Sequence, residues 1–186
     1  MRLLPTRLDG PKLIEPTIHG DARGFFCETY RRSLLSELGI SEEMVQDNQS
    51  RSRRGIVRGM HFQVGPGISK LVRCARGSIV DVVVDIRRGS PTFGRWEAFP
   101  LDDQAMHMVY CPVGFAHGFC VLSEEADVAY KQSGYHDPEL ERGIRYDDPD
   151  VGIDWPAGLE LIPSQRDAAA PLLRELADEL PFQYAG

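Results

Sequence analysis

The sequence contains no apolar run approaching the roughly 18 residues that a membrane-spanning helix requires. Its first ten residues include Arg2, Pro5, Arg7 and Asp9, so they lack the uninterrupted apolar segment of a secretory signal. We therefore expect a cytoplasmic protein with no membrane partner. At 186 residues and 42% hydrophobic content, the chain can form one domain, 1–186, around a real core.

Cysteine is scarce and scattered. The chain has four, Cys27, Cys74, Cys111 and Cys120, each in apolar surroundings and none in a Cys-x-x-Cys spacing. A structural zinc site or a disulfide framework would need clustered cysteines. We expect four reduced thiols that serve as small apolar residues.

Helical periodicity is limited to two stretches. Residues 31–38 end at Gly39, in the manner of a helix C-terminus, and residues 171–180 begin with a proline and carry an amphipathic leucine pattern. Strand patterns are more frequent. In residues 78–86, Val80, Val82 and Val84 alternate with Ile79, Asp81 and Val83, and shorter strands are predicted at 70–75, 94–101, 107–111, 117–122 and 126–132. This spacing predicts an all-β sandwich or barrel with a few short helices, including a C-terminal one.

A net positive charge is confined to the middle of the chain. Residues 51–95 hold ten Lys or Arg and two Asp, whereas residues 96–186 hold five cations and eighteen carboxylates. Arg51, Arg53 and Arg54 could contact nucleic acid, but the segment lacks interleaved aromatic residues and the acidic remainder would repel a polyanion. A small phosphorylated ligand fits the confined patch better, and we expect no nucleic-acid partner.

The most informative segment surrounds Arg58, His61 and Gln63. Gln46 and Asn48 precede it and Lys70 follows, so an imidazole, cations and amides lie close together among several glycines. Such groups suit a pocket that holds an anionic, oxygen-rich ligand beside a proton-transfer group.

A second motif, Pro-x-Gly-x-x-His at residues 112–117, resembles the second motif of cupins, which are small jelly-roll β-barrels open at one end. Cupins that bind a metal usually supply His-x-His and a carboxylate in their first motif. Here the corresponding positions are His61, Gln63 and Lys70, and a protonated lysine disfavours a cation. We expect no metal.

The ordered motifs together resemble those of the dTDP-4-dehydrorhamnose 3,5-epimerases, and the likeness runs from about residue 14 to residue 175. It rests on residues 21–28, 46–52, 55–63, 70–77, 81–96, 114–119, 130–131, 138–141, 147–156 and 164–167. The resemblance implies a cupin-like barrel that inverts C3 and C5 of dTDP-4-keto-6-deoxyglucose, giving dTDP-4-keto-L-rhamnose. Both carbons lie beside the ketone, so their hydrogens are acidic and no cofactor is required.

The resemblance also implies residue roles. His61 is the expected base, Asp167 its partner carboxylate, Lys70 the group that stabilises the enolate oxygen and Tyr130 the acid on the opposite face. The expected substrate-binding residues are Arg23, Phe26, Glu28, Gln46, Asn48, Arg58, His117, Glu141 and Arg166. The family typically forms homodimers in which an N-terminal segment completes the neighbouring site, so Arg23, Phe26 and Glu28 are expected to act in the partner.

Several of these residues also have structural interpretations. Tyr130 alternates with Val128 and could be a core residue whose hydroxyl bonds to backbone. His19, His107 and His136 are expected to be structural, and Asp81 and Asp85 to be strand-surface partners of arginines. Residues 51, 53, 54, 87 and 88 are expected to form a solvated basic face.

Two departures from the family pattern keep alternatives open. Tyr135 and His136 stand where many members carry paired tyrosines, and residues 64–69 lack the usual Pro-x-x-Gln character. Inversion at only C3 or only C5 of a related nucleotide sugar is therefore an alternative. A cupin that binds nucleotide sugars without catalysis is a second one.

Overall fold

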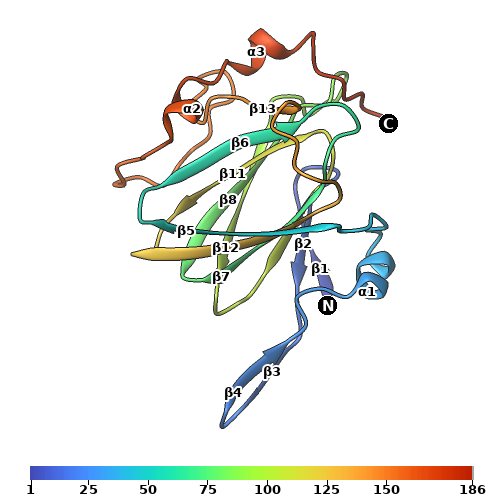
Figure 1. The fold of residues 1–186 in the computed structure, drawn as a ribbon, viewed down its shortest axis with the longest axis vertical. Coiled ribbons are helices and arrows are strands. Elements are labelled where there is room, and N and C mark those ends of the chain that lie inside the picture. Colours follow the sequence, from blue (N-terminus) through green and yellow to red (C-terminus); the bar gives the residue numbers. More distant parts are fainter. Residues whose placement is uncertain (186) are drawn as a thin grey trace.

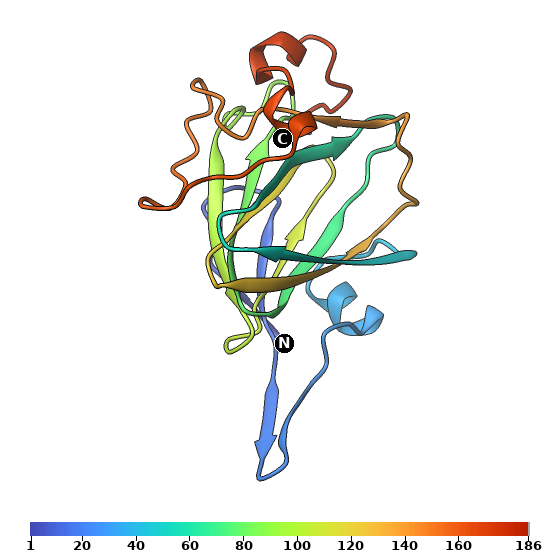
Figure 2. The same ribbon diagram turned by 60° about the vertical axis from the view of Figure 1, so that its left-hand side comes forward.

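The computed structural model of the chain, which describes residues 1–185, consists mainly of two antiparallel β-sheets that face each other (Figures 1 and 2). One sheet has the order β1 (Arg2–Leu4), β2 (Lys12–Glu15), β10 (Met108–Cys111), β7 (Lys70–Arg76), β12 (Glu125–Gln132), β5 (Gln46–Arg53). The other has the order β13 (Glu141–Gly143), β6 (Val57–Gln63), β11 (Phe115–Val121), β8 (Ser78–Asp85), β9 (Trp96–Asp102). This is the cupin-type jelly roll that the sequence predicted.

The central core lies between the sheets. Alternating residues of β7, β8, β11 and β12 point inward and form one apolar cluster, which includes Val72, Val83, Phe119 and Val128. The apolar alternation of these inward residues is the pattern from which the strands were predicted. Strands β7 to β12 correspond to the predicted strands at 70–75, 78–86, 94–101, 107–111, 117–122 and 126–132.

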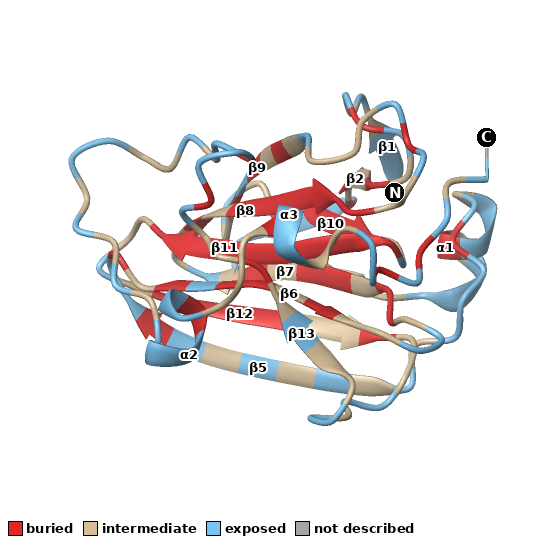
Figure 3. Ribbon diagram, turned by 90° about the horizontal axis from the view of Figure 1, so that it is seen from above, coloured by how far each residue is buried: buried red, intermediate tan, exposed pale blue. Residues whose placement is uncertain are grey.

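Both outer faces are covered in part. The helix α1 (Arg32–Glu37) packs Leu35 against the first sheet, and Ile40 packs there just after the helix. The helix ends before Gly39, whose φ of 75° only glycine adopts easily. The chain after β13 covers the second sheet with Leu173, Leu180 and Phe182. Figure 3 shows the resulting burial, which is high along β8 and β11 and low along the edge strand β5.

The C-terminal helix is shorter than predicted. Only α3 (Leu173–Leu176) is helical, whereas periodicity suggested residues 171–180. The carbonyl of Pro171 accepts a hydrogen bond from the Arg145 amide at 3.0 Å, and Leu172 is extended, so the chain enters the helix two residues late. Leu180 is nevertheless buried, as its apolar character predicted.

A close approach of β6 and β11 brings two histidines together. A Cβ atom added to Gly59, whose φ is 133°, would lie 2.5 Å from the Cα of Gly118, so both positions require glycine. The register then shifts, and His117 lies opposite His61. Two imidazoles on adjacent strands therefore face the same end of the barrel.

A hairpin of β3 (Ile18–Asp21) and β4 (Gly24–Cys27) projects away from the barrel, at the bottom of Figure 1. Phe25 and Phe26 at its end are 61% and 65% exposed. No helix within residues 1–185 is long and apolar enough to cross a membrane.

Candidate active site

A cavity of about 570 Å³ opens between the two sheets. Its walls come from β5, β6, β7, β11 and β12, from the loop after β12, and from the short helix α2 (Gln165–Ala168). Most of the candidate residues line this cavity: Gln46, Asn48, Arg58, His61, Lys70, His117, Tyr130, Glu141, Arg166 and Asp167. The structure thus brings together side chains that are more than 100 residues apart, such as His61 and Asp167.

His61 and Asp167 form a hydrogen-bonded pair. The Nε2 of His61 lies 2.7 Å from Oδ1 of Asp167, and the two side chains are 26% and 6% exposed. Burial opposes ionisation of Asp167, but the hydrogen bond and charge of His61, with contributions from Gly59 and Ser164, hold the pKa of this carboxyl below its ordinary value. The carboxylate is therefore charged at neutral pH and can stabilise an imidazolium.

His117 has a carboxylate partner of its own. Its Nε2 lies 2.8 Å from Oδ2 of Asp81, and Asp81 is completely buried. The expectation that Asp81 is a surface partner of an arginine was wrong, because its face of β8 also carries Ile79 and Val83 and points into the barrel. Asp85, also buried, does pair with Arg87 at 2.7 Å. The side chain of Arg87 is therefore mostly buried and does not belong to the solvated basic face that was predicted.

Burial favours the uncharged forms of both Lys70 and Tyr130 in the cavity. Burial of Lys70 disfavours its ammonium and lowers its pKa, although Cys111, Glu141 and Asp81 nearby oppose that effect. Burial also raises the pKa of Tyr130, so its phenol stays protonated. Tyr130 packs against the inner core and also lines the cavity, and its hydroxyl makes no hydrogen bond to backbone within residues 1–185.

The inward face of β5 forms a polar wall. Gln46 donates to Asn48 at 2.9 Å, and Asn48 donates to Gln132 of the adjacent β12 at 3.0 Å. Further along, Nε of Arg58 donates to Ser52 at 3.0 Å. The terminal guanidinium nitrogens of Arg58 make no ion pair within the described part of the chain, which leaves them available to an anion.

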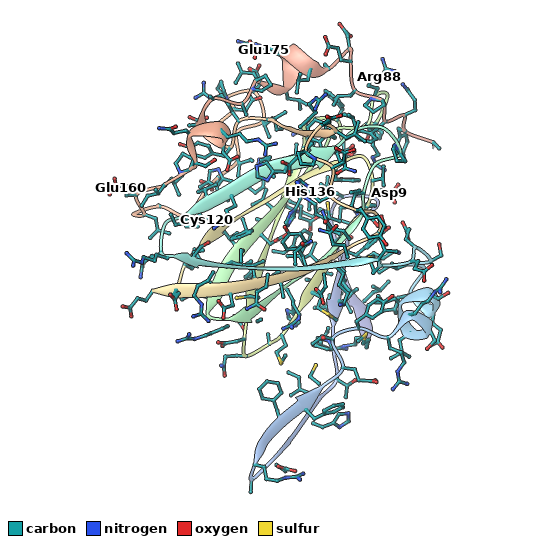
Figure 4. The ribbon with its side chains drawn as sticks, viewed as in Figure 1. Asp9, Arg88, Cys120, His136, Glu160 and Glu175 are labelled. Atoms are coloured by element: carbon teal, nitrogen blue, oxygen red, sulfur yellow. The ribbon has the colours of Figure 1, made fainter. Side chains whose placement is uncertain are left out.

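The rim of the cavity holds an acidic residue between two basic ones. Glu141 is paired with Arg166, and its other oxygen lies 3.9 Å from Nδ1 of His136. The backbone N–H of His136 donates to Gln46 at 2.9 Å. His136 therefore lines the cavity, and it lies on the loop that connects β12 to β13 (Figure 4).

The three N-terminal candidates are elsewhere. Arg23 belongs to the projecting hairpin and pairs with Asp21, Phe26 is exposed near the hairpin end, and Glu28 pairs with Arg31. None of Arg23, Phe26 and Glu28 lines the cavity of its own chain.

Sequence reasoning overlooked several residues that shape the site. Asp81 hydrogen bonds to His117, and Gln132 accepts a hydrogen bond from Asn48. Ser164 accepts a hydrogen bond from the backbone of Asp167 at 3.1 Å. The Ser-x-x-Asp spacing at 164–167 is a helix N-terminus signal that could have revealed α2.

Possible metal ligands and cysteines are dispersed in the described part of the chain. Within residues 1–185, no three His, Cys, Asp or Glu side chains come together as metal ligands would. All four cysteines are free thiols; Cys74, Cys111 and Cys120 are buried and Cys27 is partly buried. Burial raises the pKa of Cys111, which is next to Lys70 in the register, to about 12.

The barrel and its cavity groups define the class of this protein. It is a cupin-type jelly roll in which a histidine of one sheet, paired with a carboxylate of α2, shares a cavity with a protonated tyrosine and a lysine of the other sheet. Such a set is suited to moving protons on a bound small molecule.

Comparison with known proteins identifies the family within this class. The profile of the dTDP-4-dehydrorhamnose 3,5-epimerase family matches residues 5–175. The enzyme of that name from Methanothermobacter thermautotrophicus is 46% identical over 176 residues, which cover 94% of this chain and 95% of the relative. The chain therefore belongs to this family of sugar-nucleotide epimerases, as the motifs indicated.

Two further relatives bear on specificity. A dTDP-4-dehydrorhamnose 3-epimerase from Streptomyces niveus is also 46% identical, over 96% of this chain and 86% of its own length. The crystal structure of a dTDP-6-deoxy-D-glucose-3,5-epimerase from Legionella pneumophila, in complex with dTDP-4-keto-L-rhamnose, superimposes with a TM-score of 0.96 at 46% identity. The match covers 100% of this chain and 99% of that one.

Proposed function

We propose that this protein epimerises dTDP-4-keto-6-deoxyglucose at C3 and C5 to give dTDP-4-keto-L-rhamnose. The observation that carries the proposal is the pairing of His61 with Asp167 on one wall of a cavity whose facing wall supplies Tyr130. Inversion beside a ketone requires a base on one face of the sugar and an acid on the other. The two facing walls carry groups suited to these two roles.

The proposed reaction consists of two proton transfers at one carbon atom. His61 takes the proton from C3 or C5, and the electron pair of that bond moves toward the 4-oxo oxygen, forming an enolate. Lys70 and His117 donate hydrogen bonds to this oxygen, and Asp167 stabilises the imidazolium. Tyr130 then protonates the same carbon from the opposite face, and solvent restores both groups. The reaction is redox-neutral, so we expect it to need no cofactor and no metal.

The polar wall and the rim account for binding. The free end of the Arg58 guanidinium is suited to the diphosphate, where planar donors can make paired hydrogen bonds. Gln46, Asn48, Glu141 and Arg166 present polar atoms to the nucleoside and the sugar. We assign the protein to the cytoplasm, in the biosynthesis of dTDP-rhamnose.

The projecting hairpin supports a homodimer in which Arg23, Phe26 and Glu28 complete the partner's cavity. Phe25 and Phe26 expose apolar surface that a second copy would cover. The test mixes two defective variants, Arg23→Ala and His61→Ala. If the hairpin acts in trans, mixed dimers regain one intact site, and about a quarter of all sites become active after random exchange. If it acts in cis, mixing restores nothing.

The test of the main proposal is turnover in heavy water. We expect two deuterium atoms in the product, at C3 and C5, with L-rhamno stereochemistry by NMR and mass spectrometry. Deuterium at one carbon only would favour a single-carbon epimerase, the alternative raised by Tyr135 and His136 and by the 3-epimerase relative. Binding without exchange would favour a non-catalytic binding protein.

A further inference from the structure

The helix that carries Asp167 borders two cavities. One is the substrate cavity, and the second, of about 360 Å³, is also lined by small residues such as Gly143, Ala169 and Ala170. His61 and Asp167 line both cavities. The dense packing that normally fixes a buried side chain is therefore reduced around this pair.

The shortness of α2 further weakens the restraint on the position of Asp167. A helix of four residues contributes little stability of its own, because the cost of starting a helix is spread over few hydrogen bonds. The chain just before it is well anchored, since Ile162 donates to the carbonyl of Gly55 at 2.9 Å and accepts from the amide of Val57 at 3.1 Å. Residues 163–168 extend from that anchor beside β6 (Figure 1).

Ser164 connects the anchor to the helix. Its backbone is extended, with φ of −69° and ψ of 161°, and its hydroxyl accepts a hydrogen bond from the amide of Asp167 at 3.1 Å. Its carbonyl accepts from Ala168 at 2.9 Å. One residue thus receives two hydrogen bonds from the first turn, and one of them comes from Asp167 itself.

The ion pair of Arg166 with Glu141 is a weaker restraint on this turn. It joins the ends of two side chains, and that of Arg166 is 59% exposed, so the backbone of α2 can move while the pair persists. The hydroxyl of Ser164, by contrast, fixes the main chain of the residue that must meet His61.

We propose that Ser164 is a positioning residue for proton transfer: its side-chain cap sets the first turn of α2 and so holds the carboxylate of Asp167 against the imidazole of His61. This rests on the proposed function, because the pair must act as base and partner for its alignment to matter. Ser164 touches the substrate cavity but acts through Asp167.

The test compares Ser164→Ala, Ser164→Gly and Ser164→Thr. Alanine and glycine both remove the hydroxyl, and glycine is the better tolerated of the two at a helix N-terminus. We expect both to lower kcat by about tenfold to a hundredfold with little change in KM, because a small misplacement of reacting groups has effects of that size. Threonine, which keeps the hydroxyl, should restore most of kcat.

The pH profile of kcat separates positioning from general destabilisation. Ser164 is one of the groups that lower the pKa of Asp167. A displaced carboxylate changes its interaction with the imidazolium of His61, so the acidic limb of the kcat profile should shift in the alanine and glycine variants and stay at the wild-type position in the threonine variant.

Ser123 provides a matched control. Its hydroxyl accepts from the amide of Ser78 at 2.9 Å, and neither residue lines the cavity. Ser123→Ala should lower the melting temperature and leave kcat and its pH profile unchanged.

Four results would overturn the proposal: wild-type kcat in Ser164→Gly, a loss confined to KM, failure of threonine to rescue, or a glycine variant that does not fold. The last would show that the cap supports the barrel rather than the pair. An inactive wild-type enzyme would instead refute the proposed function.

Discussion

Replacing Asp167 with asparagine removes one charge from the cavity and little else. The side chain keeps its size and can still hydrogen bond to His61, whose Nε2 lies 2.7 Å from the carboxylate. What is lost is the attraction between the carboxylate and the imidazolium that forms when His61 takes a proton. The variant therefore measures that electrostatic contribution.

Its magnitude follows from the geometry. Two unit charges about 4 Å apart interact by about 4 kcal/mol at an effective dielectric constant of about 20. The side chain of His61 is 26% exposed, so solvent screens part of this, and about 2 kcal/mol is a reasonable lower figure. Since about 1.4 kcal/mol corresponds to a tenfold change in rate, kcat should fall by roughly thirtyfold to a thousandfold.

The assay is steady-state turnover of dTDP-4-keto-6-deoxyglucose, with KM expected to change by no more than a few-fold. Asp147→Asn is the matched control, because Asp147 also binds a basic side chain, Arg145, but at the surface. It should leave kcat unchanged. A kcat for Asp167→Asn within about threefold of wild type would refute the reasoning, since the computed electrostatic contribution would then be absent.

Three further predictions concern the other cavity residues. Tyr130→Phe keeps the aromatic packing but removes the acid, so product formation should fall by about a hundredfold or more while NMR still detects deuterium exchange from the His61 face; full product formation would contradict this role. Lys70 has a lowered pKa and loses its proton before an ordinary lysine does, so activity should fall on the alkaline side below pH 10.5. Lys70→Arg should retain some activity and move that limb to higher pH, and an unmoved limb would point to another group. Asp81→Ala leaves His117 buried without its partner and should lower the free energy of unfolding by about 1–3 kcal/mol in urea denaturation, whereas an unchanged midpoint would show that the pair is not stabilising.

The strands that could be predicted are those with an apolar inward face. Residues of β7, β8 and β12 alternate because Val72, Val83 and Val128 fill the core. The edge strand β5 has the same alternation of direction, but its inward residues are Gln46, Asn48, Ser50 and Ser52, since this part of the barrel borders the cavity. A polar inward face has no hydrophobic period, and the strand was missed.

The sequence pattern also could not predict which charged residues are buried. Period-two alternation placed Asp81 on one face of β8 with Ile79 and Val83, but both faces of this strand are buried, so the pattern could not say which one met solvent. The partner His117 lies on another strand, and only the register of β8 with β11 brings them together.

The site itself was predictable mainly through the family motifs. Those motifs placed His61, Lys70, Tyr130 and Asp167 together, and the cavity contains all four. The elements that hold Asp167 were not predicted, because α2 is too short to show periodicity. The contribution of the hairpin to a partner remains a prediction that the mixing experiment addresses.

The central claim is that His61 removes the acidic hydrogens. The most direct test is deuterium exchange at C3 and C5 of the bound 4-keto sugar in heavy water, for wild type and for His61→Asn, with binding of dTDP measured in parallel. We predict rapid exchange in wild type and a loss of about a hundredfold or more in the variant, with nucleotide affinity retained. Exchange at the wild-type rate in His61→Asn would contradict the account.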